Sequence, residues 1–485
     1  MSIKNRARFI TIGFLIFCIK CKNFGKDIIS IKNGGIFMSK KLLSLILCIS
    51  LFFALTMLAG CGDKGSAEVY FLNFKPESAE VYQEIAQKYE QETGVSVKVV
   101  TAAANTYEQT LKSEIAKRGA PTIFQVNGPI GYESWKDYCL NIEGTDFAKL
   151  LSDDTLAIRG KDGNGIYAIP YVVEGYGIIY NDAIMRKYFA LKDKKVNIDS
   201  AVQINNFDKL KAVVEDMTAH KNELGIDGVF ASTSLSSGED WRWQTHLLNV
   251  PLYYELRDSE DFADPTIAGL NAKEVAFRYA TNYKNIFDLY TNNSITEKGI
   301  LGSKSTSDSM AEFALGSVVM VQNGNWAWSQ IKDVKGNTVS ENDIKFLPIY
   351  TGIDGEEDQG LCIGTENYFA INKNVSEEQQ KKSLDFLYWL FSSKTGKDYV
   401  TNKLGFVTPF KSFNEQELPS DPLAREVVRY MNDQTKQTVP WIFTSFPSDV
   451  FKTEVGGSLL EYVQGNREWK DVENTVKSMW KSERK

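Results

Sequence analysis

The chain has 485 residues, of which 43% are hydrophobic, 12% aromatic and 24% charged, as in an ordinary well-packed globular protein. Its formal net charge is −7. Because residues 1–37 contribute +6 and Lys40 and Lys41 another +2, the residues that follow carry −15. This acidic balance argues against nucleic acid as a partner and against a basic membrane-binding surface.

Residues 1–37 precede a second methionine, Met38, and carry seven lysine or arginine residues against one acid. Secretory signals rarely have such a leader. The codons of Gly34 and Gly35 can spell a purine-rich ribosome-binding site at a suitable distance from Met38. We therefore expect translation to start at Met38 and residues 1–37 to be a misassigned N-terminal extension.

Residues 38–60 have the pattern of a bacterial lipoprotein signal peptide. Lys40 and Lys41 are followed by an apolar run over 42–57 and then by the lipobox Leu58-Ala59-Gly60-Cys61. The run is short for a membrane-spanning helix, which needs roughly 20 residues. The resemblance implies diacylglyceryl on Cys61, cleavage before it and a polar linker over 61–67. The alternative is an ordinary signal peptide or membrane anchor in which the cysteine occurs by chance.

Cysteine usage leaves two thiols in the body of the protein. Of six cysteines, three precede the cleavage site and Cys61 is the expected lipidation site, which leaves Cys139 and Cys362. They could form one disulfide or remain two buried thiols. We favour thiols, because nothing in the spacing supports a bridge.

Strands and helices alternate from residue 69 onward. The pattern predicts strands over 69–74, 95–100 and 122–126, with amphipathic helices over 77–93 and 107–118 between them. This order is typical of a largely parallel α/β sheet, whose ligands gather at the carboxyl ends of the strands. Further on, a capping box at Ser376 predicts a helix to about 391, and residues 468–481 form another amphipathic pattern.

Residues 165–181, GIYAIPYVVEGYGIIYN, form the first motif that resembles a known protein family. The segment resembles the first passage between the two lobes of extracellular solute-binding proteins of family 1, which are carbohydrate-binding lipoproteins of ABC importers, similar to maltose-binding protein. The resemblance implies that Glu174 reaches a sugar. The alternative is that Glu174 is a solvated loop charge.

Residues 313–328, FALGSVVMVQNGNWAW, resemble a second segment of the same family. There the first tryptophan stacks on a sugar ring, which corresponds to Trp326, and Asn325 beside it would contact hydroxyl groups. The chemistry is reasonable, because one face of a pyranose carries C–H groups that lie well on an indole ring. The alternative is a tryptophan of the core.

The remaining site residues follow from the same resemblance. Residues after the first and third strands match positions that contact sugar hydroxyls, and Gln125 stands where family members have a stacking tryptophan, which puts maltose itself in doubt. Trp241 and Trp441 lie where the second lobe would supply aromatic side chains. The expected ligand-binding residues are thus Trp326, Glu174, Asn73, Lys75, Asn127, Gly128, Gln125, Asn325, Trp241 and Trp441.

The resemblance implies the two-lobed α/β fold of type II periplasmic-binding proteins, with three hinge crossings. We expect these crossings near Glu174, at 346–348 and at 368–373. Lobe 1 would then comprise 68–173 and 347–372, and lobe 2 would comprise 174–346 and 373–485.

Signatures of catalysis were sought and not found in the sequence. There is no P-loop, no Gly-x-Ser-x-Gly and no His-Glu-x-x-His, and two histidines make a zinc site or a histidine-based triad improbable. Adjacent acids such as Glu239/Asp240 and Glu356/Glu357 could serve a glycoside hydrolase, but such pairs are usually solvated.

The expected function is therefore non-enzymatic. The protein would be a monomer, lipid-anchored on the extracellular face of a cell membrane of Gram-positive type. It would need no cofactor or metal, and it would pass a carbohydrate, expected to be an oligosaccharide, to ABC permease subunits powered by a cytoplasmic ATPase. The alternatives are a surface-anchored glycoside hydrolase and a sugar sensor that docks on a kinase.

Overall fold

A computed structural model describes residues 29–32, 35–38 and 67–484, except 104–105, 233, 259–264 and 415. The chain divides into two compact units, Met1–Ser66 and Ala67–Lys485. In the first, β1 (Ile29–Lys32) pairs with β2 (Gly35–Met38) in an antiparallel hairpin. Apart from Met38, the predicted signal peptide and Cys61 lie outside the described residues. None of the helices in the described part is long and apolar enough to cross a membrane.

The first sheet of the second unit, sheet I, mixes parallel and antiparallel strands. Its order is β4-β3-β5-β13-β7-β6. β3 pairs in parallel with β4 and β5, as the alternation predicted, whereas β13 runs antiparallel to its neighbours. The strands are β3 (Val69–Asn73), β4 (Val97–Thr101), β5 (Ile123–Asn127), β6 (Ile158–Arg159), β7 (Ile166–Pro170) and β13 (Asn367–Ile371).

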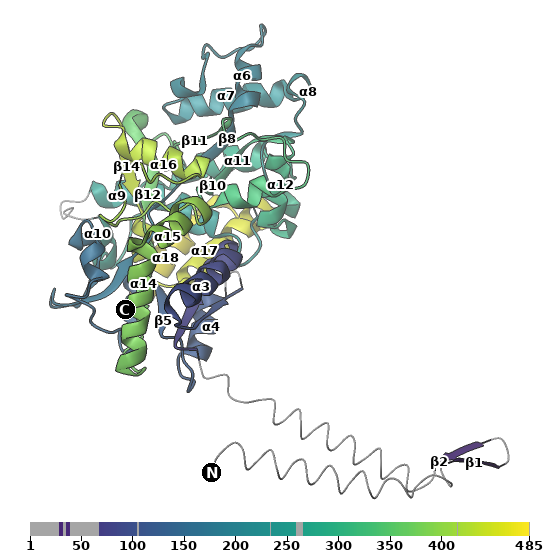
Figure 1. Ribbon diagram of the computed structural model, residues 1–485. Helices are drawn as coiled ribbons and strands as arrows, with labels where there is room; N and C mark the ends of the chain where they lie inside the picture. The colour runs from purple at the N-terminus through teal and green to yellow at the C-terminus, as the bar shows by residue number, and fades with distance from the viewer. Residues whose placement is uncertain are drawn as a thin grey trace, which may run out of the picture. The chain divides into compact units, whose positions relative to one another are not determined.

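Nine helical segments belong with sheet I in the described part of the chain, and Figure 1 shows α3, α4 and α14 near β5. They are η1 (Pro76–Ser78), α3 (Ala79–Thr93), α4 (Tyr107–Glu114), α5 (Gly128–Trp135), η2 (Ala148–Leu150), η3 (Asp154–Leu156), α14 (Glu377–Ser392), α15 (Lys394–Asp398) and η8 (Tyr399–Lys403). α3 ends at Gly94, whose φ of 76° is the left-handed conformation that glycine adopts without strain. The predicted capping box is present, since Ser376 and Gln379 cap α14 reciprocally.

The second sheet, sheet II, has the order β14-β12-β8-β10-β9, with β11 also paired to β8. Its longest strand, β8, is buried along its whole length between antiparallel neighbours. The strands are β8 (Glu174–Asn181), β9 (Gly228–Phe230), β10 (Val318–Gly324), β11 (Ile344–Leu347), β12 (Gln359–Gly364) and β14 (Gln437–Pro440).

The helical segments of the sheet II region come from both halves of the chain. They are α6 (Asp182–Phe189), η4 (Ala201–Gln203), α7 (Phe207–Ala219), α8 (Lys221–Leu224), the π-helix η5 (Arg242–Leu247), α9 (Leu248–Arg257), α10 (Pro265–Asn271), α11 (Ala280–Asn292), η6 (Lys298–Ser303), α12 (Thr306–Ala314), α13 (Ala327–Lys332), η7 (Glu356–Asp358), α16 (Pro422–Asn432), η9 (Ile442–Ser445), α17 (Asp449–Val463) and α18 (Trp469–Glu483). Trp469, Val472, Val476 and Trp480 of α18 are buried, as its predicted apolar face requires.

Within the described residues the chain passes between the sheets three times, as the two-lobed fold requires. The crossings lie between Pro170 and Glu174, between Gly364 and Asn367, and between residues 413 and 422. The first two run side by side, because β12 pairs with β8 and β13 pairs with β7. The Val173 N–H of the first crossing also donates at 2.7 Å to the carbonyl of Val407, in the segment that leads to the third. Neighbouring crossings of this kind form a hinge.

The positions of the second and third crossings differ from those expected. β11 stays in sheet II, where Ile344 and Phe346 are buried with Tyr430, so 347–364 belongs with sheet II. α14 packs on sheet I through Phe386 and Leu390, so 373–413 belongs there. Short motifs match strands, but they do not reveal which sheet each strand joins.

The two thiols of the body lie in different sheet regions. The backbone of Cys139 forms an isolated β-bridge with Asn372 beside sheet I, whereas Cys362 lies in β12 of sheet II. Both are buried and, within the described part of the chain, free, so the preference for two thiols is confirmed. Burial raises the pKa of each thiol to about 12, which keeps both protonated and unreactive.

Candidate functional site

A cavity of about 40 Å³ lies beside the crossings and is lined by residues of both sheet regions. Glu77, Ser78 and Val81 come from the segment after β3, and Asn325, Trp326 and Ser329 come from the segment after β10. The other lining residues are Glu174, Lys403, Leu404, Gly405, Phe406 and Asp421. A space this small holds little more than a water molecule, whereas small-molecule sites measure roughly 300–1,000 Å³. Entry of a larger ligand therefore requires the two regions to separate.

Trp326 and Asn325 are placed in this cavity by the turn between β10 and α13. The Asn325 side chain accepts a hydrogen bond from the Gly175 N–H at 2.9 Å, and its backbone N–H donates to the Gly175 carbonyl at 3.0 Å. The Trp326 ring lies across Gly324, where a Cβ atom would come within 2.1 Å of the ring. Glycine is therefore required there to seat the indole. Both residues line the cavity, and their predicted contact with a ligand stays a prediction.

Further aromatic side chains stand behind Trp326. The ring centroid of Trp326 is 6.0 Å from that of Trp241, 5.7 Å from that of His246 and 6.4 Å from that of Trp441. Trp241 and Trp326 are half-buried, whereas Trp441 is 4% exposed. Burial also holds the pKa of His246 well below its usual range, so this imidazole is neutral.

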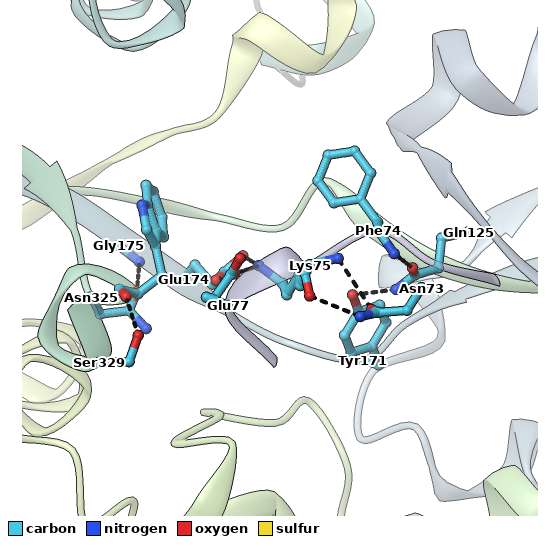
Figure 2. Close-up of polar contacts among 11 residues, drawn as sticks. Asn73, Phe74, Lys75, Glu77, Gln125, Tyr171, Glu174, Gly175, Asn325 and Ser329 are labelled. Carbon is cyan, nitrogen blue, oxygen red and sulfur yellow. Dashed lines mark hydrogen bonds and ion pairs between the residues drawn. The ribbon is translucent and has the colours of Figure 1, made fainter. Parts of the chain in front are cut away.

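An ion pair joins the two sheet regions at the centre of the site. Lys75 Nζ lies 2.8 Å and 2.9 Å from the two carboxylate oxygens of Glu174, and 3.8 Å from Glu77 Oε1. Figure 2 shows Lys75 between these acids on one side and Asn73 on the other. The Lys75 and Glu174 side chains are 6% and 4% exposed. Burial lowers the pKa of Lys75, but the carboxylates of Glu174, Glu77 and Glu366 together outweigh it and hold that pKa above its ordinary value.

Asn73 and Gln125 position the loop that carries Lys75. The Asn73 amide donates to the Lys75 carbonyl at 2.8 Å and accepts from the Lys75 N–H at 3.1 Å, which is an Asx-type turn. The fully buried Gln125 accepts from the Phe74 N–H and donates to the Tyr171 hydroxyl (Figure 2). Their predicted contact with a ligand stays a prediction, and the structure adds this positioning role.

Asn127 and Gly128 lie at the end of β5, away from the cavity. Gly128 has φ of 61° and donates its N–H to the Glu366 carbonyl at 2.8 Å. A Cβ atom there would lie 2.9 Å from the Cβ of Thr444, so this part of sheet I closely approaches η9. Trp441, the residue immediately before η9, packs on Gly364. Asn127, Gly128 and Trp441 therefore lie near the second crossing, where the end of β5 approaches η9.

Three charged groups of the site were missed by sequence reasoning. Burial raises the pKa of Glu366 to about 7, opposed by the charge of Lys75, and raises that of Asp421 to about 6. Burial also lowers the pKa of Arg242, which stacks on Trp241, to about 9. Glu366 lies in the second crossing and Asp421 in the third, so locating those crossings correctly would have pointed to both.

In each adjacent acid pair that could have suggested hydrolysis, one carboxylate accepts hydrogen bonds from backbone N–H groups. Glu239 accepts a hydrogen bond from the Thr306 N–H, and Glu356 accepts from the N–H groups of Phe207, Thr351 and Gly352. Within the residues that the structure describes, no cluster of histidine, cysteine and acidic side chains could hold a metal ion.

Two lobes joined by three hinge crossings, with a tryptophan-lined cavity between them, define a hinged binding protein. Residues 84–426 match the family of bacterial extracellular solute-binding proteins. The chain belongs to that family, as its motifs predicted, and the family is one of binding proteins. No curated protein matches the chain.

Solved structures support the fold. RafE in complex with raffinose is similar with a TM-score of 0.63 at 16% identity, over 86% of this chain and 99% of that one. A sugar transporter of Bacillus licheniformis in complex with stachyose gives 0.60 at 16% identity, over 86% and 100%. Maltose-bound MalE3 of T. maritima gives 0.62 at 14% identity, over 85% and 99%. The expected two-lobed fold is confirmed.

Proposed function

We propose that this protein captures a carbohydrate, expected to be an oligosaccharide, between its lobes and delivers it to the permease of an ABC importer. The observation that carries the proposal is Trp326, whose indole faces the interlobe cavity beside the polar side chain of Asn325. An aromatic face and a hydroxyl-binding amide are the two elements that a pyranose needs. Raffinose, stachyose and maltose in the structures of similar proteins support the same class of ligand.

The lobes would act as a clamp. We assign residues 67–173 and 365–413 to lobe 1, and 174–364 and 421–485 to lobe 2, following the sheets on which they pack. A sugar that contacts both lobes only when they are closed shifts the population toward the closed form by its differential affinity. The closed monomer would then dock on the transmembrane subunits.

A thermal-shift screen tests this function. Purified residues 62–485 are heated alone and with raffinose, stachyose, maltose or chitin oligosaccharides. A ligand at about 100 times its Kd stabilises the folded state by about 2.7 kcal/mol, so the Tm should rise by several degrees. No shift with any saccharide, or conversion of a saccharide to smaller products during incubation, would refute a role in intact delivery.

We also propose that Cys61 carries the lipid that holds the protein at the extracellular face of the membrane. The lipobox supports this, and two acyl chains hold a protein stably where one does not. Cells that express the chain are labelled with radioactive palmitate, with Cys61→Ser as the variant. Label in the native protein and none in the variant is expected, with release of the variant into the medium. Equal labelling of both proteins would contradict the assignment.

A further inference from the structure

Three carboxyl groups face the ammonium of Lys75 where the two lobes meet. Lys75 Nζ lies 2.8 Å from a carboxylate oxygen of Glu174 and 3.8 Å from one of Glu77. The charge of Glu366, the third acid, also acts on Lys75. Within the described residues, neither an ion pair nor a hydrogen-bond donor reaches the Glu366 carboxyl. Glu366 is therefore the acid of this cluster that has no direct partner.

Both sheets fix the backbone of Glu366 in the second crossing. Two residues before it, Gly364 of β12 is the cross-strand partner of Glu174 in sheet II. On the other side, the Gly128 N–H at the end of β5 donates to the Glu366 carbonyl at 2.8 Å, and the next residue opens β13 of sheet I. The half-buried side chain of Glu366 is thus held at the hinge, where closure changes its surroundings.

The charged and titratable groups that act on Glu366 come from three elements: Lys75 after β3, Glu174 and Tyr176 in β8, and Lys452 in α17. The Tyr176 hydroxyl stays protonated, because burial raises its pKa. Lys452 is 31% exposed and lies 3.2 Å from Asp449, so solvent and its own partner weaken its influence. Lys75 and Glu174 are therefore the charges that matter most to Glu366.

The charges of this cluster do not balance when the lobes are closed. Lys75 contacts Glu174, and the charge of Arg242 acts on Glu77, which leaves Glu366 over. A carboxylate that loses water without gaining a partner is costly, unless it takes up a proton.

The pKa of Glu366 agrees with this arrangement. Burial raises it to about 7, although the charge of Lys75 opposes burial and that of Glu174 adds to it. With the lobes apart, water reaches the carboxyl and its pKa returns toward the ordinary value of roughly 4.3.

We propose that closure of the lobes takes up a proton at Glu366, so that the protein holds its ligand more tightly in acidic than in alkaline surroundings. The inference rests on the proposed function, since the lobes close on the ligand, and it adds a regulation to that function. Because the closed form binds the proton more strongly, its free energy relative to the open form falls as the pH falls. The effect levels off above about pH 7 and below roughly pH 4.3, beyond the two pKa values.

Calorimetry at about pH 6 and about pH 8 measures this linkage in the native protein. The probes are raffinose, stachyose, maltose and chitin oligosaccharides, which do not titrate in this range. Binding should be about tenfold tighter at the lower pH. Buffers of different ionisation enthalpy should show uptake of about one proton per ligand bound at about pH 6. Equal affinities without proton uptake would overturn the proposal and leave the proposed function intact.

Glu366→Gln keeps a polar side chain that cannot take up the proton. Its affinities at the two pH values should agree within about twofold. The remaining difference would report Asp421, whose pKa burial raises to about 6. Glu357→Gln is the matched control, because it removes the same charge from the exposed part of η7, and it should keep the tenfold difference. Urea unfolding checks that both variants fold. A tenfold difference that persists in Glu366→Gln would overturn the assignment to Glu366.

Small-angle scattering of the unliganded protein decides the case in which no probe binds, a result that would refute the proposed function. The radius of gyration of the native protein should still be smaller at about pH 6 than at about pH 8, because protonation favours the closed form. In Glu366→Gln the two radii should be equal. Equal radii in the native protein would then overturn proton uptake on closure as well.

Discussion

Replacing Trp326 with alanine is expected to weaken saccharide binding by about 2–4 kcal/mol, or roughly 30- to 1,000-fold, in line with loss of a buried aromatic anchor. The indole is half-buried, lines the interlobe cavity and carries the apolar face on which a pyranose would lie. Because the ring faces the cavity, the fold should lose little. Titration calorimetry against the tightest ligand of the native protein gives the affinity.

The control stands two residues away in the same segment. Trp328 is 6% exposed and belongs to the apolar core beneath α13, together with Phe313 and Ile331. Trp328→Ala should therefore lower the free energy of unfolding by about 3–5 kcal/mol, the usual cost of truncating a core aromatic residue. The reverse pattern, with Trp326→Ala unstable and its affinity intact, would place Trp326 in the core and remove it from the site.

Replacing Lys75 with methionine should destabilise the protein by about 3–5 kcal/mol, because removing one partner of a buried ion pair leaves the other charge uncompensated. Lys75 faces Glu174, Glu77 and Glu366, so the variant leaves acids crowded without a cation. Burial already raises the pKa values of Glu77 and Glu366, and without the opposing charge of Lys75 these two pKa values rise further in the folded state. A raised carboxyl pKa costs stability as pH rises through it, so the loss should be larger at about pH 8 than at about pH 5.

Urea unfolding at the two pH values measures this effect. The surface pair Lys117–Glu114 offers a control, since the Lys117 side chain is 55% exposed. Lys117→Met should change stability by less than about 1 kcal/mol at either pH. If Lys75→Met changed the free energy of unfolding by as little, the charge of Lys75 would not be needed to stabilise Glu174, Glu77 and Glu366.

The same ion pair bears on the motion of the protein. Lys75 belongs to the segment after β3 of sheet I, whereas Glu174 opens β8 of sheet II, so the pair spans the hinge. With a cavity of about 40 Å³ between the lobes, a saccharide enters only after the lobes separate. A ligand that contacts both lobes in the closed form then supplies the differential affinity that closure requires.

Local patterns predicted the elements well. The strands and helices expected between residues 69 and 126 are present, and Ser376 and Gln379 form the expected capping box. Trp326 and Glu174 line the cavity, and their contact with a ligand stays a prediction. The helices and strands were predicted correctly because apolar periodicity and caps depend on residues close together in the sequence.

The crossings after Glu174 were predicted less well. The sequence pattern of a strand such as β11 is the same whichever sheet the strand joins. Alternation of apolar and polar residues indicates that one face of the strand is buried, but it does not show which sheet the strand pairs with. Asn73 and Gln125 were expected at a ligand, yet the structure occupies their amides with the loop of Lys75. Sequence spacing does not show which buried polar groups already have partners.

By itself the sequence determined the family, the alternating elements and the acidic net charge, since each is written in the residue types and their spacing. Only the tertiary structure decided where the chain crosses between the sheets, that Lys75 pairs with Glu174, and that Trp326 lines a cavity beside the crossings. The physical reason is that such pairings join residues far apart in the chain, and their energies depend on burial and distance, which exist only once the two sheets are folded together.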